Sequence, residues 1–596
     1  MNKNRRLSSI RAAMKECGVS AYYIPMGDPH MGEYIPDHWQ IIKWLTGFSG
    51  SAATVIITKT FAGLWTDSRY FIQASVQIQD SGFELMKLNS ADGLTPVEWL
   101  SRNIARKTVI GFDGRLISLK TLRQFKEKLY GKNVTINTDC DLVDGCWEGR
   151  PALPDYPAYN YPMEYAGKGR DEKIRETRQL MKEIGADYHL ITSSEDVMWL
   201  LNIRGGDTRF LPVLLSMAII TPGQVLLFTD ERKVPPRLAS DFDKEGIVLL
   251  PYTEINPVLS TLPEESSLLY NPSNTSVMLA DSVKAGTRII EDISITARLK
   301  AIRNNTEIAC LREIMVRDGV ALAKFFFWLE KNHESGDLNE PVVADKLLEC
   351  RVKQVNFMSE SFPAIVAFGK NAAMPHYSVN RSVPVQITRG ILLVDSGGQY
   401  LGGTTDITRV VSLGTPTLKQ KADFTLALKG TIALALAIFP EGTKGYQLDI
   451  LARKALWDNY LNFGHGTGHG VGSFLNVHEG PQSITPVCSH DKYLNLLPGM
   501  VVSDEPGIYR EGEYGFRTEN LMLVVPDRRS EYGLFNRFET LSLCYIDSAL
   551  VDTGLLNAGE LDWLNNYHSH VFEKISPYLD QEEKKWLKKK TEELKF

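Results

Sequence analysis

The apolar residues in the first part of the chain have two spacings, one typical of a helix and one typical of strands. Residues 5–17 carry Leu7, Ile10, Ala13 and Met14 at helical spacing, which predicts an amphipathic helix. The segments AYYIP and SAATVIITKTFAGLWTD follow and are typical of strands separated by Gly and Pro turns. The chain is therefore expected to begin with an α/β unit.

The same order of elements recurs further along the chain. The segment DEKIRETRQLMKEIGA has a helical pattern, and the apolar segments DYHLITSS, MAIITP and QVLLFTD follow it. The recurrence indicates either a structural duplication or a second, independent α/β unit, because helices and strands alternate in many folds.

Breaks in the hydrophobic pattern divide the chain into three predicted parts. Repeated proline in residues 151–162 suits neither a helix interior nor a central strand. A long amphipathic helix is predicted to begin near Asn305, with Glu307 in its first turn, where the helix dipole favours an acid. Residues 418–460 give two helical patterns broken at 440–445, and the charged C-terminus predicts a solvated helix. The expected boundaries lie near residues 157 and 304.

The composition narrows the possible partners and compartments. Of 596 residues, 43% are hydrophobic, and the net charge of −6 comes from 66 basic and 72 acidic side chains without long charged blocks. Neither nucleic acid nor a membrane is therefore expected as a partner. The seven scattered cysteines form no C-x-x-C pair, which disfavours a disulfide framework and a thiolate zinc site. Without a signal peptide or a long apolar run, the sequence favours a cytoplasmic protein.

The segment GILLVDSGGQYLGGTTDITRVVSL has the pattern of a β-hairpin. An apolar strand ends at Asp395, a glycine-rich turn follows, and an alternating strand begins at Asp406. If the turn is centred between Tyr400 and Leu401, Asp395 faces Asp406, because paired positions in antiparallel strands share a constant sum. Both carboxylates are then expected on one face.

A second segment, GMVVSDEPGIYREGEYGFRTENLMLVV, repeats this arrangement. A turn centred on Gly512 sets Glu505 opposite Glu519. Like charges that face each other across two strands are destabilising, so two such pairs indicate a bound divalent cation. The alternative is that both pairs lie at exposed hairpin ends.

Four of the 11 histidines surround these acidic pairs. His465, His469 and His478 lie in HGTGHGVGSFLNVHEGP, and His376 lies upstream in MPHYSVN. The interspersed glycines are expected to leave room for the close approach of a substrate or metal. Four carboxylates and one imidazole favour two adjacent ions such as Mn²⁺, with Zn²⁺ or Co²⁺ as alternatives, and hence a dinuclear hydrolase.

At these residues the sequence resembles the aminopeptidase P (Xaa-Pro aminopeptidase) family of the creatinase and prolidase group. The resemblance extends over the full chain, through TGFSGSA, WTDSRYFIQA, WLLNIRGGD, SFPAI and the histidine motif to LDWLNNYH. It implies the α/β fold class and a homodimer. The implied domains are two creatinase-like α/β domains, a pita-bread metallopeptidase domain and a C-terminal extension, at 1–157, 158–303, 304–545 and 546–596.

The resemblance also implies roles for individual residues. The implied metal ligands are Asp395, Asp406, His469, Glu505 and Glu519. Of these, Asp406 and Glu519 would bridge the two ions.

Substrate contacts are implied for five residues: Arg69, His376, His465, His478 and Arg517. Arg69 lies in DSRY, where relatives often have DGRY, and its alternative role is an ion pair with Asp67. The alternative for Arg517 is an ion pair that supports a ligand. Tyr509 either lines the site or is a structural aromatic residue.

The implied reaction is release of the N-terminal residue from peptides with proline in the second position. A metal-bridging hydroxide would attack the first carbonyl, Glu505 would act as general base and then acid, and His376 and His478 would stabilise the intermediate. Because proline lacks an amide hydrogen, the preference for it must come from shape and an apolar wall.

Three other functions are alternatives to this one. A prolidase, which cleaves only X-Pro dipeptides, would share all five ligands. A metal-free binding module with the same fold would have lost ligands, whereas this chain keeps them. A serine or cysteine hydrolase is disfavoured, because the sequence has no G-x-S-x-G motif and no cysteine in the histidine cluster.

Overall fold

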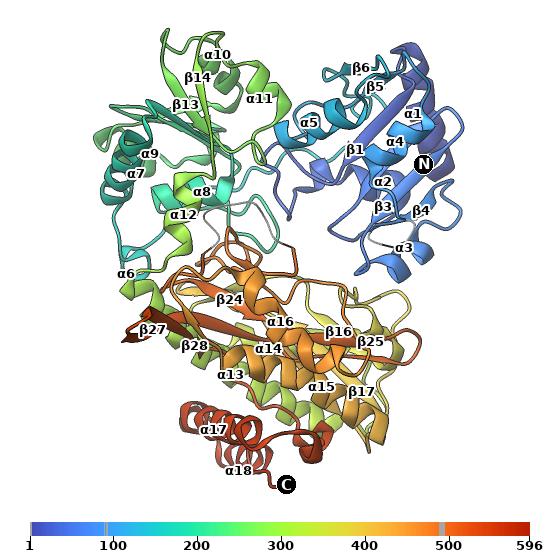
Figure 1. Cartoon of the computed structure of the whole chain (residues 1–596), viewed down its shortest axis with the longest axis vertical. Coiled ribbons are helices and arrows are strands. Elements are labelled where there is room, and N and C mark those ends of the chain that lie inside the picture. The colour runs from blue at the N-terminus through green and yellow to red at the C-terminus, as the bar shows by residue number, and fades with distance from the viewer. Residues whose placement is uncertain (1–2, 89, 91–92, 488–494) are drawn as a thin grey trace. The chain divides into compact units, whose positions relative to one another are not determined.

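The chain forms two compact units, which Figure 1 colours from blue to green and from green to red. The first unit comprises Met1–Met163 with Lys168–Ala297, and the second comprises Glu164–Gly167 with Arg298–Phe596. In the described part of the chain, no helix has the length and apolar character needed to cross a membrane. The structure, a computed structural model, describes residues 3–88, 90, 93–487 and 495–596.

Two six-stranded sheets form the framework of the first unit. The first sheet contains β1 (Ala21–Pro25), β2 (Thr54–Thr58), β3 (Ala62–Thr66), β4 (Glu84–Lys87), β5 (Val109–Gly111) and β6 (Thr135–Asn137). The second contains β8 (Tyr188–Ile191), β10 (Met217–Ile220), β11 (Val225–Thr229), β12 (Ile247–Pro251), β13 (Ser267–Tyr270) and β14 (Arg288–Glu291). The short strands β7 (Tyr159–Asn160) and β9 (Ile203–Arg204) pair with each other.

The two sheets share one topology. The first has the order β4-β3-β2-β1-β5-β6, in which β2 is antiparallel to both of its neighbours and the remaining pairs are parallel. The second has the order β12-β11-β10-β8-β13-β14, and β10 takes the place of β2 with the same orientations. Of the two alternatives offered by the sequence, the structural duplication is therefore confirmed.

The helices of the first unit follow the predicted pattern. The helix expected at residues 5–17 is α1 (Lys3–Glu16), which buries Leu7, Ile10 and Met14. The next predicted helix is α7 (Arg170–Ile184), which ends at Gly185 in the left-handed region (φ 71°). The others are α2 (Ile41–Thr46), α3 (Phe71–Gln77), α4 (Pro96–Asn103), α5 (Leu119–Lys128), α8 (Ser194–Leu201), α9 (Pro236–Lys244), α10 (Ile255–Ser260) and α11 (Val277–Asp281). Two short helices, α6 (Met163–Ala166) and α12 (Ile295–Ala301), lie where the chain passes between the units.

The second unit combines antiparallel sheets with long helices. Its three-stranded sheets are β16-β17-β20 and β15-β18-β19, its four-stranded sheet is β21-β28-β27-β24, and β22-β23 and β25-β26 are two-stranded. The strands are β15 (Phe357–Glu360), β16 (Ile365–Phe368), β17 (Ile391–Ser396), β18 (Gly398–Tyr400), β19 (Gly403–Thr404), β20 (Ile407–Ser412), β21 (Ile438–Pro440), β22 (Gly468–His469), β23 (Ser483–Ile484), β24 (Val501–Asp504), β25 (Gly507–Arg510), β26 (Tyr514–Arg517), β27 (Asn520–Ser530) and β28 (Gly533–Thr540).

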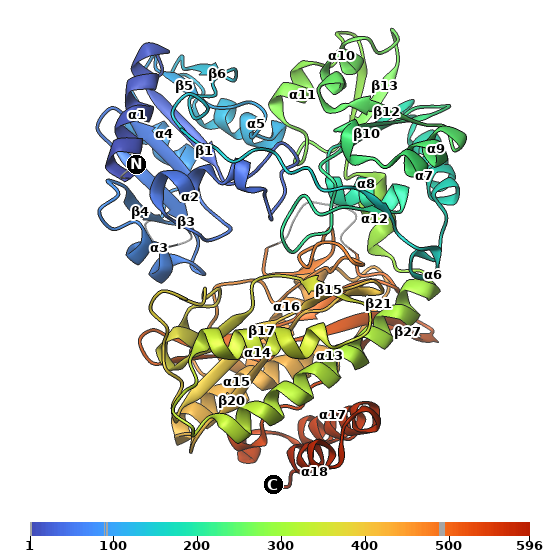
Figure 2. The ribbon, with the colours of Figure 1, turned by 180° about the vertical axis from the view of Figure 1, so that it is seen from behind.

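Helices cover the strands of this unit, as Figure 2 shows for α13 and α14. The predicted long helix is α13 (Asn305–Asn332), whose capping box joins Asn304 and Glu307 as the sequence suggested. Buried apolar residues of α13 pack with those of β17 and β20 in the main core. The remaining helices are α14 (Glu340–Val352), α15 (Leu418–Ala435), α16 (Gly445–Trp457), α17 (Ala558–Ile575) and α18 (Gln581–Lys590).

Candidate metal centre

The first acidic hairpin has a register that differs from the predicted one. Asp395 on β17 lies opposite Thr408 on β20, and not opposite Asp406. The prediction was wrong because Tyr400 pairs with Gly403, which leaves two residues between them in the turn. This moves the register by two positions. A shift of two keeps alternate side chains on the same face of a strand, so both aspartates can still reach one site.

The second hairpin has the predicted register. Gly507 on β25 pairs with Arg517 on β26, and Asp504 on β24 pairs with Asn520 on β27. Both pairs have the same sum of residue numbers, which centres the turn on Gly512. Glu505 and Glu519 lie opposite each other in the gap between the two ladders.

Both hairpins contribute to one cluster of donor atoms in the second unit. Oxygens of Asp395, Asp406 and Glu519 lie within 4.8 Å of one another, and so do donor atoms of His469, Glu505 and Glu519. The two groups share Glu519. All five side chains that the family resemblance implies as ligands are thus brought together, and the alternative of exposed hairpin ends is wrong, because Asp395, Asp406 and Glu519 are buried.

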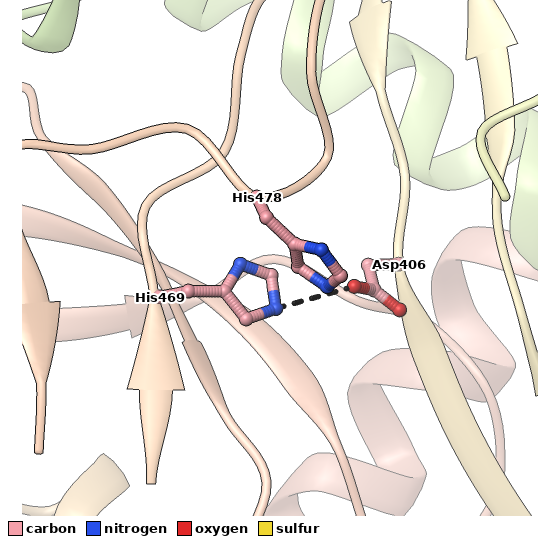
Figure 3. A group of neighbouring side chains, drawn as sticks. All are labelled: Asp406, His469 and His478. Carbon is pink, nitrogen blue, oxygen red and sulfur yellow. Dashed lines mark ion pairs between the residues drawn. The ribbon is translucent and has the colours of Figure 1, made fainter. Parts of the chain in front are cut away.

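Two imidazoles face the same carboxylate. Figure 3 shows His469 and His478 pointing toward Asp406 from neighbouring segments. One donor atom from each of these three residues lies within 4.8 Å of the others, and the two rings meet edge to face at 4.4 Å. His469 Nδ1 must donate to the Gly470 carbonyl at 2.9 Å, because a carbonyl oxygen only accepts. Nε2 of His469 therefore points at Asp406 (3.4 Å) and Glu505 (3.6 Å).

Burial and repulsion shift the pKa values of the acidic groups in the cluster. Burial raises the pKa of Asp395 to about 7, against the lowering effect of Arg517. Burial also raises the pKa of Glu505, and it raises the pKa of Glu519 well above its ordinary value with help from the neighbouring charge of Asp406. Burial lowers the pKa of His469, but Asp406 and Glu505 outweigh it and raise that pKa to about 9.

The donor set fits divalent metal ions. Among the described residues, Oδ1 of Asp395 and Oδ1 of Asp406 are buried and accept no hydrogen bond. Buried carboxylate oxygens normally have a partner, so these atoms are suited to coordinate a cation. Carboxylates with one imidazole match hard or borderline ions.

The glycines around His469 make room for the protein's own backbone. A Cβ atom at Gly468 would lie 1.9 Å from the Ser503 carbonyl oxygen, and one at Gly470 would lie 2.1 Å from that of Glu479. The sequence interpretation expected this room to serve a substrate or metal. The structure corrects it at these two positions, where the glycines let neighbouring segments pack closely enough to hold His469 beside the acidic hairpins.

Arg517 lies at the centre of a hydrogen-bonded chain behind the cluster. It is 2% exposed, and its Nη2 donates to Asp395 Oδ2 at 2.6 Å. This is the supporting ion pair that the sequence offered as the alternative role. Nη1 donates to the Tyr509 hydroxyl (2.8 Å), which also bonds His465 Nε2 (2.8 Å). Nη2 also donates to the carbonyl of Pro375, the residue before His376, at 3.2 Å.

Arg69 lies in the first unit, where it pairs with Asp67. Its Nε donates to Oδ1 at 2.8 Å and its Nη2 to Oδ2 at 2.7 Å, and the Arg69 side chain is 28% exposed. The ion pair that the sequence offered as the alternative role is therefore present. Contact of Arg69 with a peptide stays a prediction.

Sequence reasoning missed Thr408, which supports the cluster, and a buried ion pair next to His478 along the chain. Thr408 Oγ1 donates to Glu519 Oε2 at 2.6 Å and accepts from Arg517 Nε at 3.0 Å. A correct placement of the turn would have predicted Thr408 opposite Asp395. Lys300 and Glu479 form a buried ion pair at 3.2 Å beside His478, and the sequence carries no signal for it, because the two lie far apart along the chain.

Comparison with protein families matches every part of this architecture. The description "Creatinase/Prolidase N-terminal domain" fits residues 6–143 and again 149–307. "Metallopeptidase family M24" fits residues 309–526, and "C-terminal region of peptidase_M24" fits residues 534–594. The fold and the site thus define a metallopeptidase of family M24 that carries two creatinase/prolidase N-terminal domains.

Individual relatives narrow the family further. A probable Xaa-Pro aminopeptidase P of Talaromyces stipitatus is 37% identical over 614 residues, which cover 100% of this chain and 93% of the relative. One from Laccaria bicolor is also 37% identical, with 99% and 93% covered. The crystal structure of X-prolyl aminopeptidase from Caenorhabditis elegans, described as a cytosolic enzyme with a di-nuclear active site, has a TM-score of 0.96 at 34% identity and 100% coverage of both chains. The chain belongs to the Xaa-Pro aminopeptidase P family.

Proposed function

We propose that the chain releases the N-terminal residue from peptides that have proline in the second position. One observation carries the proposal, namely the convergence of two overlapping donor groups, Asp395 with Asp406 and Glu519, and His469 with Glu505 and Glu519, each within 4.8 Å. The names of the relatives in T. stipitatus and C. elegans support the choice of substrate.

Five residues of this cluster would hold two divalent metal ions. The proposed ligands are Asp395, Asp406, His469, Glu505 and Glu519, and Asp406 and Glu519 would each contact both ions. Mn²⁺ suits this mixed donor set best, with Zn²⁺ and Co²⁺ as alternatives. When bound, the ions make a water molecule more acidic and offset the negative charge that develops on the substrate carbonyl. Burial, and then repulsion between the carboxylates, raises the pKa values of Asp395 and Glu519, and a bound cation would offset both effects, which supports the proposal.

The protein's own side chains would move the proton and hold the peptide. Glu505 takes a proton from the attacking water at its carboxylate and delivers it to the proline nitrogen as the bond breaks. Burial raises the pKa of Glu505, and this direction supports a role in which the carboxylate accepts a proton and later releases it. His376 and His478 would donate hydrogen bonds to the oxygen of the tetrahedral intermediate, and Arg517 would keep Asp395 in place.

Several finer features belong to the same proposal. Arg69 and His465 would contact the peptide, and the domains would span residues 1–157, 158–303, 304–545 and 546–596. The description of the C. elegans enzyme as cytosolic supports a cytoplasmic location. A homodimer stays a prediction, which sedimentation of the full chain would test.

Substrate length separates this function from that of a prolidase. The full chain, loaded with Mn²⁺, should cleave Xaa-Pro-Xaa peptides after the first residue and should leave Xaa-Ala-Xaa peptides largely intact. Cleavage of Xaa-Pro alone would identify a prolidase. A protein that binds the metal and cleaves none of these peptides would contradict the proposed reaction.

A further inference from the structure

The backbone of Glu519 is held at both ends by strand β20. Its amide nitrogen donates to the Thr408 carbonyl at 3.2 Å, and its carbonyl oxygen accepts from Arg409 Nη1 at 2.7 Å. The same arginine nitrogen also donates to the Thr408 carbonyl at 2.9 Å. Thr408 and Arg409 thus bond the backbone of Glu519 on both sides of the Cα atom that carries its carboxylate.

Arg409 is a buried cation held by neutral oxygens. It is 3% exposed. Its Nη2 donates to the Tyr567 hydroxyl at 2.6 Å and to Asn520 Oδ1 at 2.7 Å, and its Nε donates to the Cys544 carbonyl at 3.1 Å. Within the described residues, its acceptors are all backbone carbonyls, an amide and a phenol, with no carboxylate. A guanidinium buried in this way depends on every acceptor for its orientation, because the attraction of a directly paired carboxylate is missing.

Tyr567 brings the C-terminal helix α17 to this arginine. Its hydroxyl donates to the Ser542 carbonyl at 2.9 Å while it accepts from Arg409, so the phenol is fixed on both sides. Its ring stacks on Trp563 at a centroid distance of 5.2 Å and an interplanar angle of 2°. Helix α17 itself packs against α13 and α15 within the second unit, as Figure 2 shows for α13. Tyr567 is therefore a rigid part of the scaffold, 6% exposed.

We infer that Tyr567 is a positioning residue for Glu519 and acts through Arg409, so that helix α17 is part of the support of the metal centre. The inference rests on the proposed function, because it takes Glu519 as a ligand. Helix α17 would then position a metal ligand as well as stabilise the fold. The chain of contacts runs from the Tyr567 hydroxyl through the Arg409 guanidinium to the Glu519 carbonyl.

The test is Tyr567→Phe in the full chain, which removes the hydroxyl and keeps the stacked ring. Mn²⁺ is titrated into metal-free protein by calorimetry, and kcat and KM are measured on an Xaa-Pro-Xaa peptide. We expect the dissociation constant of the weaker Mn²⁺ ion to rise about tenfold and kcat to fall by about the same factor, the lower end of what loss of a ligand's supporting contact costs. KM should change by less than about twofold, because Tyr567 touches no substrate.

His568→Leu provides the matched control on the same helix. His568 Nε2 accepts from the Ile546 amide at 3.2 Å, so this variant loosens the same helix without removing a hydrogen bond of Arg409. Its melting temperature should fall while Mn²⁺ affinity and kcat stay at the wild-type values. If Tyr567→Phe also loses only thermal stability and keeps wild-type Mn²⁺ affinity and kcat, Tyr567 is purely structural and the inference is wrong.

A second variant tests the chain of contacts through Arg409 if Tyr567→Phe does not fold. Arg409→Lys keeps the buried positive charge but cannot reach all the acceptors of the guanidinium. It should weaken Mn²⁺ binding and lower kcat, and normal values for both would overturn the inference. The wild-type titration separates this outcome from failure of the proposed function. If wild-type protein binds no Mn²⁺, the ligand assignment fails, whereas normal wild-type binding with unaffected variants rejects only the role of Tyr567.

Discussion

Thr408 Oγ1 donates a hydrogen bond to Glu519 Oε2 at 2.6 Å, which joins the second strand of the first acidic hairpin to the carboxylate of the second. Thr408 also lies opposite Asp395 in the ladder. The Thr408 hydroxyl thus orients one acidic side chain of each hairpin. It bonds Glu519 directly, and it acts on Asp395 through Arg517.

Thr408→Val should reduce catalysis without unfolding the protein. The two side chains have nearly the same shape, but valine cannot donate to Glu519, and a hydrogen bond to a charged group contributes about 1.5 to 3 kcal/mol. We expect kcat to fall about tenfold or more in steady-state assays. Thr408→Ser, which keeps the hydroxyl, should recover most of the activity. Equal activity of the valine and serine variants would show that the hydroxyl is unimportant.

Asp406→Asn or Glu519→Gln should abolish peptidase activity and remove at least one equivalent of metal. Each change removes a charge that the two ions are proposed to share. The melting temperature of the metal-free protein should not fall, because the change relieves repulsion among buried carboxylates. Elemental analysis, peptide assays and thermal melting check the three parts. An active variant with its full metal content would rule out that ligand.

The second hairpin could be predicted more accurately than the first for a physical reason. Gly512 is the single glycine between Arg510 and Tyr514, and its φ of 76° requires the left-handed region, so it marks the turn. The first hairpin has glycines on both sides of Tyr400 and Leu401, and several turn positions satisfy the same pattern. These turn positions differ only in strand register. The register depends on tertiary packing, which the sequence pattern does not describe.

The support of the cluster was beyond prediction because it is made by distant segments. Arg409 lies in the segment of the first acidic hairpin and Tyr567 lies 158 residues further on, in LDWLNNYH, and neither pattern indicates that the two side chains meet. The histidine motif, by contrast, carries its chemistry within a short stretch, and it predicted His469 and His478 correctly as neighbours of the acidic pairs. The local pattern therefore predicted which side chains come together, and only the tertiary structure showed what holds them.

Chelation should inactivate the enzyme reversibly. After a chelator has been removed by dialysis, Mn²⁺ should restore activity better than Mg²⁺, since Mg²⁺ loses its water reluctantly and accepts imidazole poorly. Rates on an Xaa-Pro-Xaa peptide at matched metal concentrations provide the comparison. Equal recovery with Mg²⁺ would argue against His469 as a ligand.

Arg69→Ala tests the role proposed for the first unit. Loss of a charged hydrogen bond to the far end of the peptide should lower kcat/KM for longer Xaa-Pro-Xaa peptides about tenfold, equivalent to about 1.5 kcal/mol, with metal content unchanged. Asp67→Asn is the matched control, because it weakens the ion pair but keeps the guanidinium. If both variants lose thermal stability and hydrolyse every peptide normally, Arg69 is structural.

The buried His568 predicts a pH dependence of stability. Burial, aided by the charge of Arg409, lowers its pKa to about 4, while the unfolded chain titrates near 6.5. Between these values only the unfolded state binds the proton, so acidification through this range removes up to about 3 kcal/mol of stability. The difference in melting temperature between wild type and His568→Leu should therefore narrow from pH 7 to pH 5. A constant difference would show that His568 is not buried in its neutral form.

Anomalous diffraction from crystals of the full chain loaded with Mn²⁺ would show whether the five proposed side chains hold two ions. Two anomalous peaks are expected in each chain. Carboxylate oxygens of Asp406 and Glu519 should contact both ions, and Asp395, His469 and Glu505 should complete their ligands. A single peak, or peaks bound by other residues, would contradict this proposal.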